Sequence, residues 1–139
     1  MKLAIRIAGI VKMNRDVEET LQRMRLGRKY TAVLLPATPA NEKLLASVRN
    51  FIAYGELSQE ALLELLQKRA RPLDKKKKLD FSEAAAQLGR KSLEELGFKP
   101  FFRLHPPRGG IDARLHFGVR KGVLGEHKEK INNLVRRML

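Results

Sequence analysis

The chain begins with alternating apolar and polar residues. Leu3, Ile5, Ile7 and Val11 fall on one side of an extended segment, and Arg6 falls on the other. A period of two with β-branched residues is typical of a strand that buries one of its faces. The first dozen residues therefore predict a half-buried β-strand.

A helical period follows this strand. Asn14 or Asp16 can cap the helix, and Gly27 is expected to stop it. The apolar stripe of this helix recurs at i, i+4 and i+7 and consists of Val17, Leu21 and Met24. We expect this stripe to pack against the sheet.

The next segment repeats the strand and helix pattern. Residues 31–35 form an apolar run that predicts a buried strand, and Thr38 with Pro39 predicts the start of a second helix. Residues 51–54 fit either the end of that helix or a third strand. We favour a strand that Gly55 closes, because aromatic and β-branched residues gather there. The resulting β-α-β-α-β order predicts a small α+β sandwich with its helices on one face of the sheet.

The pattern changes after residue 57, so we divide the chain into segments 1–57 and 58–139. Ser58 is expected to begin a helix, and residues 82–96 predict one or two short helices interrupted at Gly89 and stopped at Gly97. Lys75 to Lys78 form a solvated connector. Residues 101–104 predict a strand, and the apolar spacing of residues 131–138 predicts an amphipathic C-terminal helix.

The charge balance points to a polyanionic partner. The chain has 29 Lys and Arg against 15 Asp and Glu, a net charge of +14. Nucleic acid and an anionic membrane surface are the two candidates. No apolar run approaches the roughly 20 residues of a membrane span, and the N-terminus does not read as a signal peptide. Without cysteine there is no disulfide framework, which suits a cytoplasmic protein.

Residues 99–121 hold the densest candidate site. They contain six basic residues and one acid, Asp112. Arg108-Gly109-Gly110 follows Pro106-Pro107, so an extended chain presents a loop whose backbone N–H groups can approach phosphates. Arg114, His116 and Arg120 alternate with apolar residues and are expected on one side of an extended segment. A solubilised surface loop is the alternative explanation.

A second basic cluster consists of Arg23, Arg25, Arg28 and Lys29 at the end of the first helix. It either contacts RNA or complements the helix dipole, and the sequence leaves both explanations open. Aromatic residues make up only 6% of the chain. Since single-strand binders rely on base stacking, this scarcity favours recognition of a folded RNA through its phosphates and shape.

The candidates for catalysis are few. His105, His116 and His127 are spaced eleven residues apart, which does not fit a metal site on one helix. His105 with Asp112 could cleave RNA by general acid–base chemistry, but no nucleophile elbow or P-loop accompanies them. We therefore expect no enzyme, no cofactor, no metal and no small-molecule substrate. An RNA-processing enzyme and a free-standing RNA-binding module remain the alternatives to a structural role in a ribonucleoprotein.

Several motifs resemble the family of the universal large-subunit ribosomal protein thirty in its longer archaeal form, which is related to the eukaryotic large-subunit protein seven. Residues 5–9 are similar to its first strand, residues 20–26 to its first helix and turn, and residues 51–56 to its third strand. Residues 104–110, followed by Lys121-Gly122, Leu124-Gly125 and His127, resemble its archaeal C-terminal extension.

The resemblance implies a ferredoxin-like core with a helical C-terminal extension. It also implies a structural place in the large ribosomal subunit of the cytoplasm, bound to large-subunit rRNA close to the 5S RNA and to neighbouring ribosomal proteins. Together with the charge pattern it gives a set of residues expected to contact RNA: Arg6, Arg23, Arg25, Arg28, Lys29, Arg103, His105, Arg108, Gly109, Gly110, Arg114, His116, Arg120 and Lys121.

Overall fold

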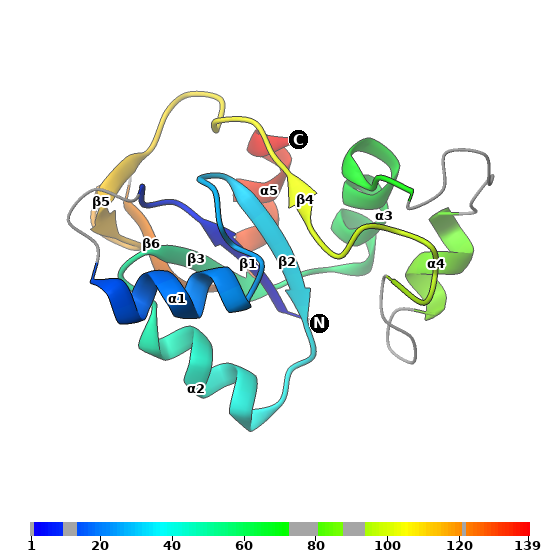
Figure 1. Cartoon of the computed structure of the whole chain (residues 1–139). Helices are drawn as coiled ribbons and strands as arrows, with labels where there is room; N and C mark the ends of the chain where they lie inside the picture. The colour runs from blue at the N-terminus through cyan, green and yellow to red at the C-terminus, as the bar shows by residue number, and fades with distance from the viewer. Residues whose placement is uncertain (1, 10–13, 73–80, 88–93, 121) are drawn as a thin grey trace.

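A six-stranded sheet forms the centre of the computed structural model (Figure 1). The structure describes residues 2–9, 14–72, 81–87, 94–120 and 122–139, with only the backbone described at 81–82 and 112–114. The strands are β1 (Lys2–Arg6), β2 (Thr31–Leu35), β3 (Ile52–Glu56), β4 (Phe102–Arg103), β5 (Asp112–His116) and β6 (Gly122–Lys128), and they lie in the order β4-β2-β1-β3-β6-β5. The helices are α1 (Arg15–Arg23), α2 (Pro39–Ser47), α3 (Gln59–Arg69), α4 (Phe81–Gln87) and α5 (Ile131–Met138). The predicted α+β class and the ferredoxin-like β-α-β-α-β core are confirmed.

Strand β1 lies in the middle of the sheet and is buried on both faces. It pairs antiparallel with β2 and with β3. Leu3 and Ile5 belong to one hydrophobic cluster, whereas Ala4 belongs to a cluster on the opposite face. The predicted alternation is therefore confirmed, but the expectation of a half-buried strand was wrong because helices cover both faces. Val11 lies outside the described residues.

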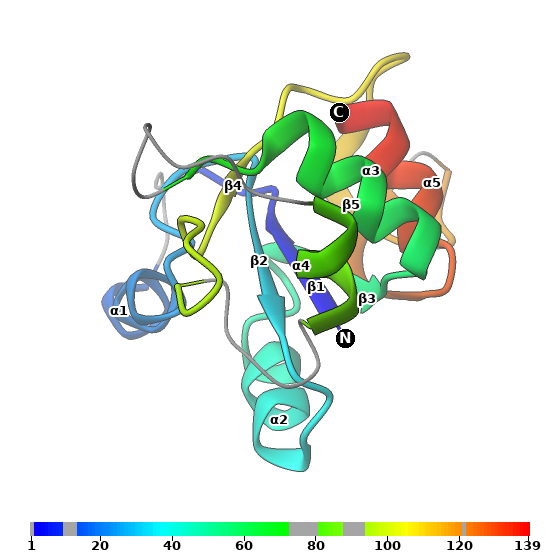
Figure 2. The ribbon, with the colours of Figure 1, turned by 90° about the vertical axis from the view of Figure 1, so that its right-hand side faces the viewer.

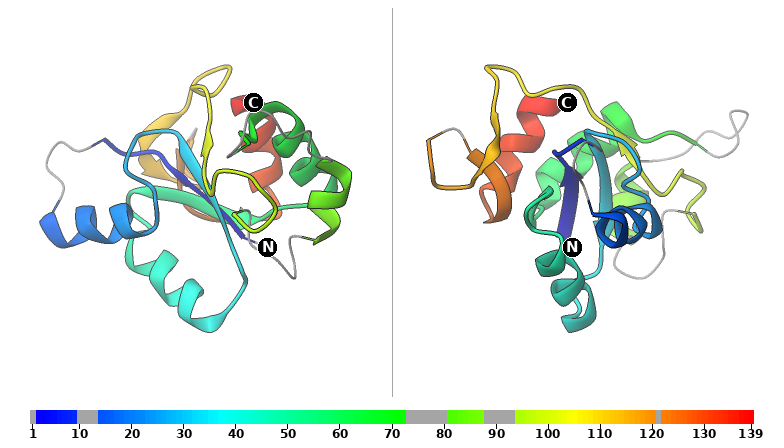
Figure 3. Two further views of the ribbon diagram at one scale, coloured as in Figure 1. Left: turned by 45° about the vertical axis from the view of Figure 1, so that its right-hand side comes forward. Right: turned by 60° about the vertical axis from the view of Figure 1, so that its left-hand side comes forward.

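The helices divide between the two faces of the sheet. Figure 2 shows α1 and α2 on one side of the strands and α3 and α5 on the other, and Figure 3 shows the same layers from two further directions. Leu21 of α1 and Leu45 of α2 share one core cluster with Val33 of β2. Leu65 of α3 and Val135 of α5 are fully buried in the other. The first two helices share one face, as predicted, and the C-terminal segment supplies the helices of the second face.

Helix α1 begins as predicted and ends earlier than predicted. The Asn14 side chain accepts a hydrogen bond from the Asp16 N–H at 3.2 Å. At the other end Arg25, not Gly27, takes the left-handed conformation (φ 63°). The Leu26 N–H then bonds the Leu21 carbonyl at 2.8 Å, and both side chains are buried together. This is a Schellman closure with its usual apolar contact, so the helix ends at Arg23 without needing glycine.

The predicted starts of two other helices are confirmed. Thr38 accepts a hydrogen bond from the Asn41 N–H, and Pro39 is the first residue of α2. Ser58 caps α3 in the same way through the Ala61 N–H. Both caps satisfy N–H groups that a helix leaves without partners at its start.

Gly55 lies inside β3 and does not close it, contrary to the prediction. The strand continues to Glu56 and pairs in parallel with β6. A Cβ atom built on Gly55 would lie 2.3 Å from the Lys128 carbonyl oxygen and 2.9 Å from the Ile131 Cβ. The glycine is therefore required by the close approach of β6 and α5, not by a turn.

Strands β5 and β6 were not predicted as a pair. They pair at the edge of the sheet with an irregular register. The chain turns after His116, and Arg120 is in the left-handed region (φ 48°), so the extended segment expected through residue 120 ends at His116. Strands β4 and β6, from the segment 58–139, join β2 and β3 in one sheet.

The remaining C-terminal predictions are partly confirmed. A strand is present at Phe102–Arg103 and a helix at Ile131–Met138. Helix α4 covers part of the helical region predicted at 82–96, and Gly97 adopts a positive φ of 89°. Lys75 to Lys78 and Gly89 lie outside the described residues. None of the described helices has the length and the apolar content that a membrane span requires.

Candidate nucleic-acid interface

The Pro-Pro-Arg-Gly-Gly loop follows β4 and is anchored on the C-terminal end of α5. The His105 N–H donates to the Met138 carbonyl at 3.0 Å, and the Arg108 N–H donates to the Arg137 carbonyl at 3.1 Å. A helix leaves its last carbonyl groups without partners inside the helix, and the loop supplies donors to two of them. Figure 1 shows this loop, in yellow, passing beside the C-terminus of the chain.

Arg137 completes the anchoring from the helix side. Its Nε donates to the Arg108 carbonyl at 2.9 Å, and its Nη2 donates to the Gly110 carbonyl. Gly109 (φ 79°) and Gly110 (φ 74°) both adopt left-handed backbone, which glycine takes without strain. The loop is therefore held through its backbone, and the side chains of His105 and Arg108 stay exposed.

Arg103 on the edge strand β4 lies near other positive charges. Its Nη1 donates to the Thr31 hydroxyl at 3.0 Å, and its guanidinium lies 4.9 Å from the centre of the Phe101 ring. Burial lowers the pKa of Arg103, and the positive charges of Arg28 and Arg71 lower this pKa further. The electrostatic environment of this guanidinium therefore favours a bound anion.

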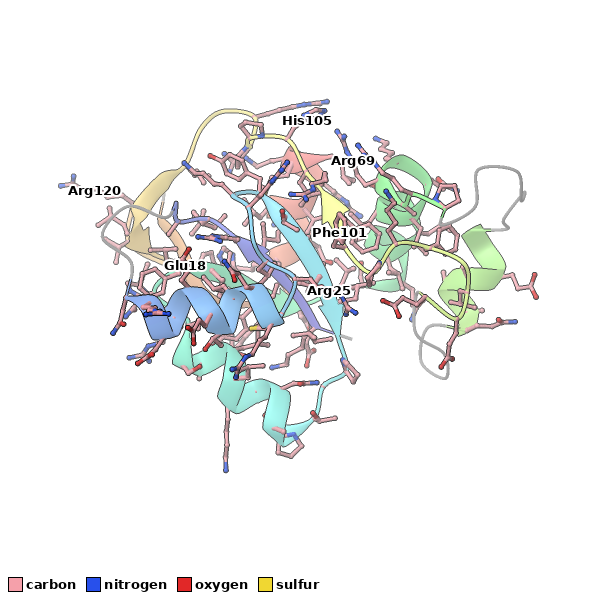
Figure 4. All side chains as sticks on the ribbon, in the orientation of Figure 1. Glu18, Arg25, Arg69, Phe101, His105 and Arg120 are labelled. Atoms are coloured by element: carbon pink, nitrogen blue, oxygen red, sulfur yellow. The ribbon has the colours of Figure 1, made fainter. Side chains whose placement is uncertain are left out.

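The basic groups on β4, the loop and the end of α3 lie along one side of the molecule. Phe101, His105 and Arg69 lie around β4 and the neighbouring ends of α3 and α5 in Figure 4. Arg69 is partly buried, and its Nη2 donates to the Leu139 carbonyl at 3.2 Å. We name this surface the β4 strip; it consists of Arg28, Arg69, Arg71, Arg103, His105, Arg108, Gly109, Gly110 and Arg137.

The cluster at the end of α1 is divided by the structure. Arg25 forms an ion pair with Glu94 at 3.0 Å. Arg28 and Lys29 are exposed, and the Lys29 ammonium lies 5.2 Å from the centre of the Tyr30 ring. Arg23 is exposed in the last turn of α1, where it also complements the helix dipole. Arg28 therefore extends the β4 strip, whereas Arg25 already has a carboxylate partner.

Arg6 is placed in the interior, unlike the other expected RNA contacts whose side chains the structure describes. Its side chain is only 1% exposed. Nη1 donates to the Leu26 carbonyl at 2.8 Å and Nε donates to the Ala8 carbonyl at 3.0 Å. Desolvation by burial lowers its pKa, partly offset by the charge of Glu18. Arg6 thus joins β1 to the turn after α1, and we exclude it from the proposed RNA contacts.

His116 and Arg120 belong to a different part of the surface. Both are exposed, and Arg120 extends beyond the outer end of β5, well apart from His105 (Figure 4). The side chain of Arg114 and the whole of Lys121 lie outside the described residues. The structure therefore does not bring the expected residues of 103–120 into one group.

Sequence reasoning missed three members of the β4 strip: Arg69, Arg71 and Arg137. Arg69 ends α3, and Arg71 follows the helix by two residues. Arg137 lies in the last turn of α5, where a basic residue also has an ordinary role opposite the helix dipole. No local motif marks any of them, because only the fold brings these chain segments beside β4.

His127 is the buried histidine of the three. It is 3% exposed, and its Nε2 donates to the Val123 carbonyl at 2.6 Å. Burial lowers the pKa of His127, and this effect outweighs the opposing effect of the hydrogen bond. Among the described residues, no group of three or more histidines and carboxylates is placed to hold a metal ion.

A pH dependence of stability follows from this burial. Because the unfolded chain binds a proton at His127 more readily than the folded chain, the free energy of unfolding should fall as the pH drops below about 6.5. Above that value the imidazole is neutral in both states and the effect vanishes. The free energy of unfolding in urea should differ less between pH 7.5 and pH 5 for H127Q than for the original chain. Equal differences would contradict this assignment.

The fold and the anchored basic loop define a class: small α+β proteins with a ferredoxin-like core that carry a strongly basic surface. A family model described as ribosomal protein L30p/L7e matches residues 3–52. The large ribosomal subunit protein uL30 of Archaeoglobus fulgidus is 36% identical and covers 99% of both chains. Those of Nanoarchaeum equitans and Ignicoccus hospitalis are 36% and 39% identical, with 96% and 99% of this chain and 96% of each relative covered. The chain belongs to the ribosomal protein L30p/L7e family.

Proposed function

We propose that this protein is a structural constituent of the large ribosomal subunit, in the cytoplasm, and that it braces folded rRNA through the β4 strip. The observation that carries the RNA contact is the loop at 105–110, whose backbone is held by α5 while the Arg108 side chain remains exposed. Such preorganisation lowers the entropic cost of presenting an arginine to phosphate. Family membership and the net charge of +14 support the same assignment.

We place the protein near the 5S RNA and beside other ribosomal proteins, and we assign it no catalytic step and no small-molecule substrate. We propose a second, separate RNA contact through His116 and Arg120, both exposed at the β5–β6 edge, and Arg114 and Lys121 remain contacts expected from the sequence alone. Hydroxyl-radical footprinting of large subunits with and without the protein tests the location, because protection near the 5S RNA is the expected result.

The salt dependence of binding tests the β4 strip. Each phosphate contact should contribute up to about −0.9 to the slope of log K against log salt. R108Q and R103Q should each reduce the slope by about 1 for a transcript of the Archaeoglobus fulgidus large-subunit rRNA. The matched control is K43Q, which removes one exposed charge from α2, outside the strip.

The comparison of these variants decides the proposal. We expect K43Q to bind with the slope of the original chain in a filter-binding titration between low and moderate salt. Equal slopes for R108Q, R103Q and the original chain would place the phosphates elsewhere. Weak binding of the original chain at every salt concentration would contradict the proposed function itself.

A further inference from the structure

Phe117 is an exposed aromatic ring in a chain with few aromatic residues. Phe117 and Val119 are the large apolar side chains that the described part of the chain leaves exposed, at 39% and 51%. Both lie in the turn between β5 and β6. The β4 strip does not include this turn, so the exposed ring needs a separate explanation.

The ring of Phe117 is held in place from behind. It stacks on the His127 ring with a centroid separation of 4.1 Å and an interplanar angle of 30°. His127 is itself buried and bonded to the Val123 carbonyl, and the Phe117 N–H donates to the Leu124 carbonyl at 2.8 Å. An exposed ring with a supported face and a paired backbone is a preorganised stacking platform, since little side-chain freedom remains to be lost on binding.

A cavity of about 460 Å³ lies beside the ring, between the end of α2 and the β3–β6 pair. Its apolar walls are Tyr54, Phe117 and Leu124, and its polar groups include Arg49, Asn50 and Glu126. Gly125, another lining residue, has left-handed backbone (φ 98°), which glycine takes without strain. The cavity thus combines an aromatic wall with hydrogen-bonding groups of both kinds.

Positive groups surround this aromatic wall. The Lys130 ammonium lies 5.8 Å from the centre of the Phe117 ring, and Arg49 lines the cavity. Arg120 is exposed three residues after Phe117. A flat ring flanked by cations is complementary to a flat base carried on a phosphate chain.

We propose that this cavity takes an unpaired nucleobase of the RNA, stacked on Phe117. Asn50 and Glu126 line the cavity with an amide and a carboxylate that can bond the edge of the base, and Glu126 also pairs with the Lys2 ammonium at 3.8 Å. Arg49 lines the same cavity and can neutralise a flanking phosphate. The inference rests on the proposed rRNA function and adds to it: the β4 strip contacts the phosphates of folded RNA, whereas this cavity holds one base that has left its helix.

Three variants test the stacking contact, with the Archaeoglobus fulgidus large-subunit rRNA transcript as the probe. F117L keeps apolar bulk and removes the ring, and should weaken binding by about ten- to a hundredfold. F117W keeps a ring and should bind within about threefold of the original chain, by the same stacking argument. V119A alters the exposed neighbour that does not line the cavity, and should bind like the original chain.

The salt slope identifies the kind of contact that is lost. Because stacking releases no counterions, F117L should lower the affinity at every salt concentration and leave the slope unchanged. Ultraviolet cross-linking of the complex should yield a nucleotide on the peptide that carries Phe117, and this readout does not depend on how well F117L folds. Full affinity of folded F117L, or a cross-link-free Phe117 peptide in a complex that forms, would overturn the inference while leaving the rRNA function intact. Failure of the original chain to bind the transcript would instead contradict the proposed function.

Discussion

Replacing Gly55 with alanine is expected to lower the free energy of unfolding by about 3 kcal/mol. The added Cβ would lie 2.3 Å from the Lys128 carbonyl oxygen and within 3.0 Å of two Ile131 side-chain atoms. One of these neighbours is backbone, so the clash cannot be relieved by rotating a side chain. Either β6 moves away from β3 or α5 moves off the sheet. Both changes open the core cluster that contains Leu65 and Val135.

Gly27 provides the matched control for this substitution. A Cβ built there meets no atom within 4 Å, and its φ is not in the left-handed region. G27A should therefore leave the free energy of unfolding within about 1 kcal/mol of the original chain. Chemical denaturation of both variants measures the difference. A stability of G55A equal to that of G27A would contradict the close packing of β3, β6 and α5.

Replacing Arg6 with methionine is expected to lower the free energy of unfolding by about 3 kcal/mol. Methionine fills part of the volume but donates no hydrogen bond, so the carbonyls of Leu26 and Ala8 lose the partners that Arg6 gives them in the interior. Leaving buried polar groups without partners is costly, because they have exchanged water for the guanidinium. The turn after α1 should loosen first, since Arg6 bonds directly to it.

R108Q separates structural arginines from RNA-binding ones. The Arg108 side chain is exposed, so the midpoint temperature of unfolding of R108Q should be close to that of the original chain. R6M should unfold at a clearly lower temperature. RNA binding should show the opposite order: R108Q loses part of its salt dependence, and R6M keeps the full slope at a temperature where it is folded. Normal stability of R6M would place the Arg6 side chain outside the core.

Local sequence signals predicted the elements whose causes are local. Asn14, Thr38 and Ser58 cap their helices through hydrogen bonds that span two or three residues. The strand at 31–35 was predicted with its observed bounds, because a short apolar run in the middle of a sheet needs no partner information to be recognised. These features depend on the order of neighbouring residues and little on the rest of the fold.

Long-range packing decided the features that were missed. Strand β6 contains Gly122 and Gly125 and three charged or histidine residues near its end, so it does not have the composition of a strand. It is nevertheless buried, because β3 and β5 enclose it. Gly55 was predicted to end β3 for the same reason. A glycine is required there because the Lys128 carbonyl, which is distant in sequence, leaves no room for a side chain.

The candidate site shows the same division. The loop at 105–110 was identified from its prolines, glycines and arginine, whereas the anchoring by Arg137 and the approach of Arg28 and Arg71 to Arg103 depend on the fold. Arg6 was assigned to RNA from the charge pattern and the family resemblance. Helix α1, the turn that follows it and α2 cover the side of β1 that carries Arg6, so its side chain is enclosed there.

The central claim is that this protein is a structural part of the large ribosomal subunit. Sucrose-gradient sedimentation of ribosomes from cells that produce it, washed at high salt and probed for this chain, tests the claim most directly. We predict that the protein migrates with the large subunit after the wash, because a contact surface divided between the β4 strip and the β5–β6 edge should resist dissociation. Its recovery only in the slowly sedimenting free fraction, with large subunits that lack it, would contradict the assignment.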